Sequence, residues 1–373
     1  MATITGASIT VVALVVSGTM VALSLASATF GPRVARNFVR RPSTHLIIGA
    51  FVATFVYSLV VLTSVFSSAS GAFIPLVSTW SAVVAALAAA GLLVWWIHDL
   101  AFSIQIGNVI LGITGDLARA IDDQQRELAR LVSSDGPVPA PSNTAAIVLC
   151  PTSGYIQVVR HNDLVRAATT AGAVIHLEHR AGEFALAGTP LARVDPPEAF
   201  EAVGPKIQRA VVVGAYRTLE QDLLYAIDQL VEIAVRALSP GVNDPFTAIM
   251  CIDWLADGVS RVEANPVRGR GIAGSDGTIC LVIPAEKTAG IIDAAFDQIQ
   301  QAAVGHPVVT VHLLTTMSRL APLVGQSSRD ALRLHADTVV ERALHAASLV
   351  KDINVIEAAH RSAITSMAGV QPA

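Results

Sequence analysis

Residues 45–66 read HLIIGAFVATFVYSLVVLTSVF and contain no Asp, Glu, Lys or Arg. A transmembrane helix needs about 20 consecutive apolar residues, so this stretch is long enough to cross a bilayer by itself. Two further stretches of the same character flank it, at about 4–28 and 74–97. The sequence therefore predicts an N-terminal region, residues 1–98, built from transmembrane helices.

The composition of the whole chain agrees with this division. Of the 373 residues, 53% are hydrophobic and only 14% are charged, whereas soluble proteins carry about 25% charged residues. From Asp99 onward the composition is that of an ordinary soluble protein. The net charge of −4 argues against nucleic acid as a partner, and the lipid bilayer is the partner we expect.

One loop carries the information on orientation. It lies between the first and second predicted spans and contains four arginines without an accompanying acid: Arg33, Arg36, Arg40 and Arg41. Because positive loops stay in the cytoplasm, this loop is expected inside and the short turn at 67–73 outside. Everything after the third span is then cytoplasmic.

The first span carries a periodic pattern of hydroxyl groups. They recur every seven residues, at Thr3, Thr10, Ser17 and Ser24. One interpretation is a pore lined by hydroxyls in an oligomer. The other is helix packing, in which small and hydroxylated residues let backbones approach closely, as Gly18, Ala22 and Ala26 also would.

The soluble part begins with an amphipathic pattern that predicts a long stalk helix over residues 99–135. A β-rich module follows at 146–196, with strands expected at 146–150, 154–159, 173–179 and 190–194. Its phrases 181–184 and 188–191 resemble the barrel-sandwich repeat of biotinyl and lipoyl domains. No lysine lies between 146 and 195, which argues strongly against a carrier role.

A helical corner is predicted at 197–265. A helix over 214–238 ends at a Ser-Pro-Gly turn, and Asp244 is placed to cap a new helix with a proline in its first position. The corner has this structural explanation, but free N–H groups at a helix start also attract anions. The candidate residues are Ser239, Pro240, Gly241, Asn243, Asp244 and Pro245.

The last part, 266–373, is predicted to be a small α/β unit with a C-terminal helix. Residues 269–274 spell GxGxxG but lack the strand-before, helix-after context of a nucleotide-binding loop. Strands are expected at 277–283 and 308–314, helices at 285–303 and 328–367. Because no nucleophile–base pair or metal-ligand spacing is present, we expect no enzyme, cofactor or metal.

Three phrases together resemble a known family. They are VALSLAS at 21–27 followed by FGPR at 30–33, QLV at 229–231, and RALSPGVNDPFTA at 236–248. They resemble a family of bacterial predicted membrane proteins catalogued as domain of unknown function 2254. The resemblance runs from about residue 3 to the end and implies a bacterial inner membrane. Its members usually carry one more N-terminal span; it implies no activity or cofactor.

The fold class expected is thus an α-helical transmembrane region plus an α+β cytoplasmic region. The latter would contain a stalk helix, a small β-barrel or sandwich-like module, the helical corner and the small α/β unit. Three spans without internal charge are too few to enclose a path, so a transport function requires a homo-oligomer. The first hypothesis is an oligomeric channel- or transport-type protein with a cytoplasmic regulatory domain. The alternative is a membrane-anchored sensor or scaffold for a ligand not yet identified.

Overall fold

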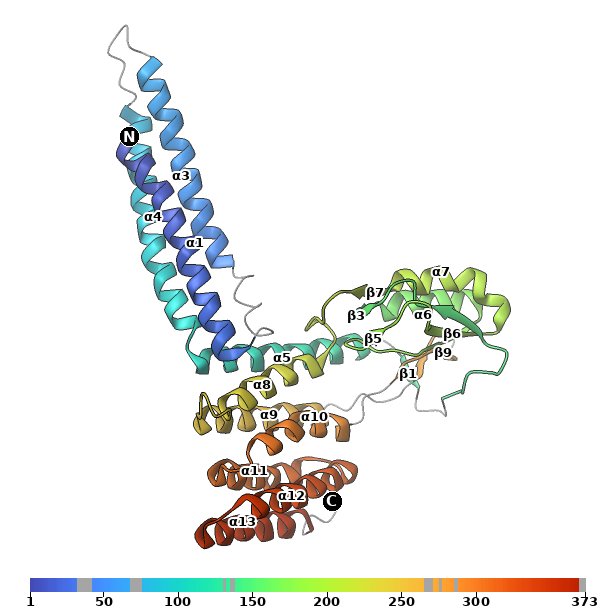
Figure 1. Cartoon of the computed structure of the whole chain (residues 1–373). Helices are drawn as coiled ribbons and strands as arrows, with labels where there is room; N and C mark the ends of the chain where they lie inside the picture. The colour runs from blue at the N-terminus through green and yellow to red at the C-terminus, as the bar shows by residue number, and fades with distance from the viewer. Residues whose placement is uncertain are drawn as a thin grey trace. The chain divides into compact units, whose positions relative to one another are not determined.

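The chain folds as two compact units, Met1–Leu111 and Gly112–Ala373. The structure is a computed structural model, drawn in Figure 1. It describes residues 1–31, 42–67, 76–129, 132–134, 138–264, 271–274, 277–284 and 288–368. The four loop arginines and the 67–73 turn, apart from Ser67, lie outside these ranges.

The first unit contains three helices, α1 (Ala2–Phe30), α3 (Pro42–Ser67) and α4 (Leu76–Ser103), packed along one another (Figure 1). All three are long and apolar enough to cross a membrane, over Ala2–Ala28, Ser43–Thr63 and Leu76–Ser103. The three predicted apolar helices are therefore confirmed. Their shared core consists of Val15, Ile47, Phe51, Ala89 and Trp96.

Trp96 is the aromatic side chain with an indole N–H in this core. The neighbouring Trp95 is exposed, whereas Trp96 is only 4% exposed. Its indole N–H donates to Thr44 Oγ1 at 3.3 Å, and a Cβ on Gly18 would lie 3.4 Å from its ring. Gly18 thus packs inside the chain, where its missing side chain makes room for an aromatic ring.

The predicted continuous stalk is interrupted. After α4, the chain turns at Ile104 and Gln105 and starts a separate helix, α5 (Ile106–Ala129). The Asn108 amide donates to the carbonyl oxygen of Phe102 at 2.7 Å, which satisfies an acceptor that a continuing helix would have used. The amphipathic face itself is confirmed, because Ile110, Ile113, Leu117 and Ile121 are buried.

The second unit contains two open sheets. The larger has the order β1-β8-β9-β4-β6-β2 and is antiparallel except between β4 and β9. Its strands are Val132–Ser134, Gly271–Ala273, Ile279–Val282, Val174–Leu177, Pro190–Asp195 and Ala146–Leu149 in that order. The smaller sheet runs β5-β3-β7, which are Phe184–Ala185, Gly154–Val159 and Val211–Gly214.

The four strands predicted in the β-rich module are confirmed as β2, β3, β4 and β6. The barrel-like closure is wrong: in the described residues neither sheet closes on itself, because the strands separate into two sheets. The predicted C-terminal α/β unit also differs, because it has no sheet of its own in the described residues. β8 and β9 join the sheet of β4 and β6, far from them in sequence.

Two helices complete the module, α6 (His161–Ala171) and, after a 3₁₀ turn at Pro197–Ala199 (η1), α7 (Phe200–Ala210). Sequence analysis predicts no helix between β3 and β4, where α6 lies. Both helices bury apolar residues at helical spacing: Leu164, Ala168, Val203 and Ile207, each 0% exposed. These side chains belong to one core with the strands of both sheets.

The rest of the unit is helical: α8 (Leu223–Ala237), α9 (Pro245–Ala264), α10 (Thr288–Ala302), α11 (Pro307–Leu320) with a 3₁₀ turn at Ala321–Leu323 (η2), α12 (Gln326–Ala346) and α13 (Val350–Ala368). The helix predicted over 214–238 is shorter than expected, because β7 and a loop precede it. The strand predicted at 308–314 is wrong. Val309, Leu313 and Met317 are buried in α11 at a spacing of four. The helical periodicity of the buried residues therefore outweighs the strand preference of the β-branched residues in this segment.

Candidate functional site

The hydroxyl stripe of α1 does not face the core of its unit. Thr3, Thr10, Ser17 and Ser24 are all exposed, whereas the residues that pack inward include Val15, Ala22 and Ala26. The Thr10 hydroxyl donates to the Gly6 carbonyl oxygen at 2.9 Å, within its own helix. Packing against α3 and α4 therefore does not account for the stripe.

The corner between α8 and α9 is held by its own hydrogen bonds. Asn243 adopts a left-handed conformation, φ 50°, and donates its N–H to the Ser239 carbonyl at 2.9 Å. The Asp244 N–H donates to the Ala237 carbonyl at 2.7 Å. Pro240 and Gly241 are exposed between them, and Pro245 opens α9. The backbone thus makes the tight turn that the Ser-Pro-Gly phrase predicts.

Asp244 has the geometry predicted for the cap of α9. Its Oδ1 accepts from the Thr247 N–H at 3.2 Å and its Oδ2 from the Thr247 hydroxyl at 2.6 Å. One turn further, burial and then the charge of Asp244 raise the pKa of Cys251 to about 12. The Cys251 thiol is therefore protonated at neutral pH and is unsuited to nucleophilic chemistry.

A second acidic cap starts α8. Asp222 is 4% exposed, accepts from the Tyr225 N–H at 3.1 Å and receives both arms of Arg217 at 2.6 and 2.9 Å. Although burial lowers the pKa of Arg217, its contacts with Asp222 and Asp228 raise it above the ordinary value. Arg217 is thus shared by two carboxylates on the first turns of α8, an arrangement typical of a structural joint.

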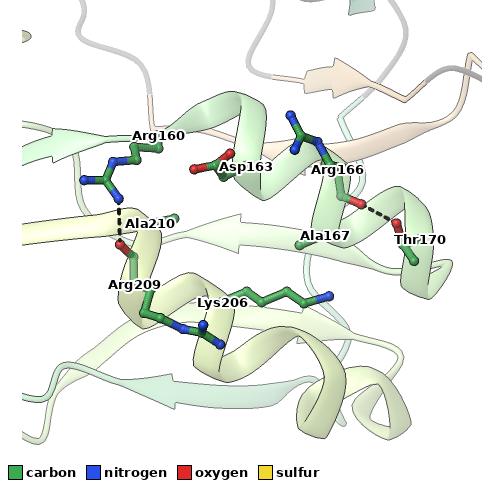
Figure 2. A pocket seen from close by; sticks show the side chains of 8 residues that line it. All are labelled: Arg160, Asp163, Arg166, Ala167, Thr170, Lys206, Arg209 and Ala210. Carbon is green, nitrogen blue, oxygen red and sulfur yellow. Dashed lines mark hydrogen bonds between the residues drawn. The ribbon is translucent and has the colours of Figure 1, made fainter.

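Positively charged side chains, in contrast, line a pocket between α6 and α7, called the cationic pocket below. Its volume is about 290 Å³, and it is lined by Arg160, Asp163, Arg166, Ala167, Thr170, Lys206, Arg209 and Ala210. In Figure 2, Asp163 and Arg166 on α6 and Arg160 just before its start line one side, and Lys206 and Arg209 on α7 line the other. Four cations and a single carboxylate therefore surround one concavity.

The walls of this pocket are fixed to one another. The Arg160 N–H donates to the Ala210 carbonyl at 3.0 Å, and its guanidinium lies 3.5 Å from the Arg209 carbonyl (Figure 2). The Arg209 side chain donates to the Pro205 carbonyl at 3.1 Å. A cation at the C-terminal end of α7 also complements the helix dipole. The start of α6 and the end of α7 thus form one rigid rim.

Sequence analysis misses this pocket. A signal is present, since positions 160, 163, 166, 167 and 170 follow helical spacing along one face. It becomes readable only once the segment after β3 is known to be a helix. The second half, Lys206 and Arg209, belongs to another helix, and no local pattern connects the two.

Metal chemistry has no support in the parts of the chain that the structure describes. There, no group of three or more His, Cys, Asp or Glu side chains is placed to hold a metal ion. The GxGxxG phrase is described only from Gly271, and Gly271–Ala273 form strand β8. That strand pairs with β9 and β1, so this part of the phrase is not a loop before a helix.

Comparisons with known proteins agree with this architecture. The model of the family described as "Predicted membrane protein (DUF2254)" matches residues 1–319. Uncharacterised proteins of Mycobacterium tuberculosis (strain H37Rv) and Mycobacterium bovis are each 30% identical over 349 residues, 90% of this chain. The chain spans 66% of the length of these relatives. No solved structure matches the chain.

The family match covers the three apolar helices, both sheets and the α8–α9 corner. It includes the RALSPGVNDPFTA phrase at 236–248, which forms that corner. With relatives at 30% identity over most of its length, the chain belongs to the DUF2254 family of predicted membrane proteins.

Proposed function

We propose that the protein is a non-enzymatic, homo-oligomeric membrane protein of the channel or transport type, with its second unit as the regulatory part. The observation that carries the proposal is the exposed hydroxyl stripe of α1: Thr3, Thr10, Ser17 and Ser24. An isolated three-helix unit has no internal use for this stripe, because its inward face uses other residues.

An oligomer gives the stripe a role. Small and hydroxylated side chains permit close helix–helix approach in lipid, and hydroxyl oxygens retain lone pairs that accept from a neighbouring helix or from permeating water. Three spans do not enclose a path, but several copies arranged around a common axis do. The stripe then lines the path or forms the contact between copies.

The test compares Ser17→Leu with Val21→Leu, a conservative change one turn along the same exposed face of α1 that leaves the hydroxyl groups in place. If the stripe lines a path, Ser17→Leu abolishes ion flux in liposomes and leaves the oligomer intact. If it forms the contact, the same change dissociates the oligomer in detergent. Val21→Leu should do neither. A Ser17→Leu variant that assembles and conducts normally would rule out both roles.

The orientation is part of the proposal. Four arginines at 33–41 support a cytoplasmic loop, and three spans would then leave the second unit on the cytoplasmic side of a bacterial membrane. A reporter fused at Ala373 should then be active inside. A cysteine introduced at Ser70 should react with an impermeant reagent in intact cells; reaction only after permeabilisation would reverse the orientation.

A second candidate function is a membrane-anchored ligand sensor in which the spans only tether. The cationic pocket of the second unit favours it, because it provides a rigid concavity with uncompensated charge. Ligand binding by the full chain without flux of any ion tested would support this candidate over the first.

A further inference from the structure

The lining of the cationic pocket between α6 and α7 holds more positive than negative charge. Among the described residues, Arg160, Arg166, Lys206 and Arg209 form no ion pair, and Asp163 is the one carboxylate in the lining. Three positive charges therefore remain uncompensated. Like charges held in one concavity repel each other, and a bound anion removes that repulsion.

The side chains define the chemistry of the anion. Three are arginines, whose planar guanidinium groups donate paired hydrogen bonds that match phosphate oxygens. The volume of about 290 Å³ is larger than an inorganic phosphate needs and close to the lower end of small-ligand pockets. Ala167 and Ala210 give the pocket a small apolar floor. The fit is to a compact ligand with two or more negative charges.

The pocket is also connected to α5. Arg160 of the pocket precedes His161, whose Nδ1 lies 2.8 Å from Glu127 Oε1 on α5. The second oxygen of Glu127 accepts from the Gln221 amide at 3.0 Å. Gln221 in turn bonds the N–H and C=O of Val159, at 2.8 and 3.1 Å. Glu127 therefore clamps the β3–α6 junction at which the pocket begins.

We propose that this pocket binds a small phosphate-bearing anion and that its occupancy is transmitted to α5 through Glu127. The binding part stands on the pocket alone. The transmission part rests on the proposed function, in which the second unit regulates the spans. The phosphate belongs either to a soluble molecule or to a lipid headgroup, and the chemistry of recognition is the same for both.

Binding is tested on the full chain purified in a maltoside detergent, which contains no phosphate. Inorganic pyrophosphate is titrated by calorimetry. Arg166→Gln and Lys206→Gln should each weaken its binding about tenfold, since each removes a charge-assisted hydrogen bond. Asp163→Asn should strengthen it about threefold by removing the opposing charge. Arg333→Gln, an exposed cation on α12, is the matched control and should change nothing.

The outcomes separate the ligand sources. If pyrophosphate does not bind but short-chain phosphatidylglycerol does in native mass spectrometry, and Lys206→Gln removes it, the phosphate is that of a lipid. If neither binds, there is no phosphate site. If Arg333→Gln weakens binding as much as Arg166→Gln, or Asp163→Asn fails to strengthen it, attraction to the general surface explains the result and the proposal is wrong.

Transmission is tested by hydrogen exchange of the α5 amides with and without saturating pyrophosphate. The wild type should show slower exchange near Glu127 on binding, and Glu127→Gln should bind pyrophosphate but lose this change. Unchanged α5 exchange in the wild type would rule out transmission. Binding with no flux in any condition would instead contradict the channel function and leave the pocket intact.

Discussion

The cap at Asp244 gives the sharpest test of whether the α8–α9 corner is structural or binds a ligand. Asp244→Ala removes two hydrogen bonds, from the Thr247 N–H and from the Thr247 hydroxyl. Loss of an N-cap costs about 1 kcal/mol. Thr247 is 6% exposed, so its hydroxyl loses a partner in a buried place, at about 1 kcal/mol more.

The expected sum is a loss of about 2 kcal/mol of unfolding free energy. For a unit of this size each kcal/mol moves the melting temperature by about 2–4 °C, so Asp244→Ala should melt about 4–8 °C lower. Asp244→Ser can still accept from the Thr247 N–H but not also from the hydroxyl. It should therefore recover about half of the loss.

The assay is scanning calorimetry of the full chain in detergent, with ion flux measured on the same samples. A structural corner predicts that activity follows stability across both variants. A ligand site predicts that Asp244→Ser recovers the same half of the stability but is inactive, because the carboxylate contact with the ligand is lost. If Asp244→Ala melts within about 1 °C of the wild type, the reasoning from these two bonds is refuted.

Three further predictions concern the second unit. Arg217→Leu should lower the unfolding free energy by about 3–5 kcal/mol, because it leaves the buried Asp222 carboxylate unpaired. Adding Asp222→Asn should recover most of this loss, and a double variant no more stable than Arg217→Leu would contradict the pairing. Gly182→Ala should cost about 3 kcal/mol, since Gly182 has φ 91° and a Cβ would clash with the Asp222 carboxylate; a loss under about 1 kcal/mol in urea unfolding would show that the loop between β4 and β5 relaxes. Burial lowers the pKa of His176, with the nearby Asp195 opposing it, so the unfolded chain takes up the proton first and stability should fall as pH drops below about 6.5. His176→Gln should make that decline shallower than in the wild type; equal slopes would mean that His176 does not contribute.

Local features of the chain were predictable because their causes are local. The three apolar helices follow from composition, since long apolar runs favour helices that satisfy their own backbone hydrogen bonds. The turn at 239–245 follows from residues that bond to partners three to seven positions away, as Asp244 does to Thr247 and Ala237. Four strands of the β-rich module were also readable from their apolar runs.

Only the tertiary structure decided how distant segments combine. Strand β9 pairs with β4, about a hundred residues earlier in the chain, and β8 extends the same sheet. No local sequence pattern encodes a pairing between segments so far apart. In the folded unit the two barrel-like phrases belong to open sheets, and the packing of α6 against α7 brings Arg166 to the pocket that it shares with Lys206. Sequence alone determined which segments are apolar enough to cross lipid and where the chain turns, because composition sets the first and short-range hydrogen bonding sets the second. Which faces meet, and hence the cationic pocket and the exposed stripe of α1, were set by packing between elements far apart in the chain.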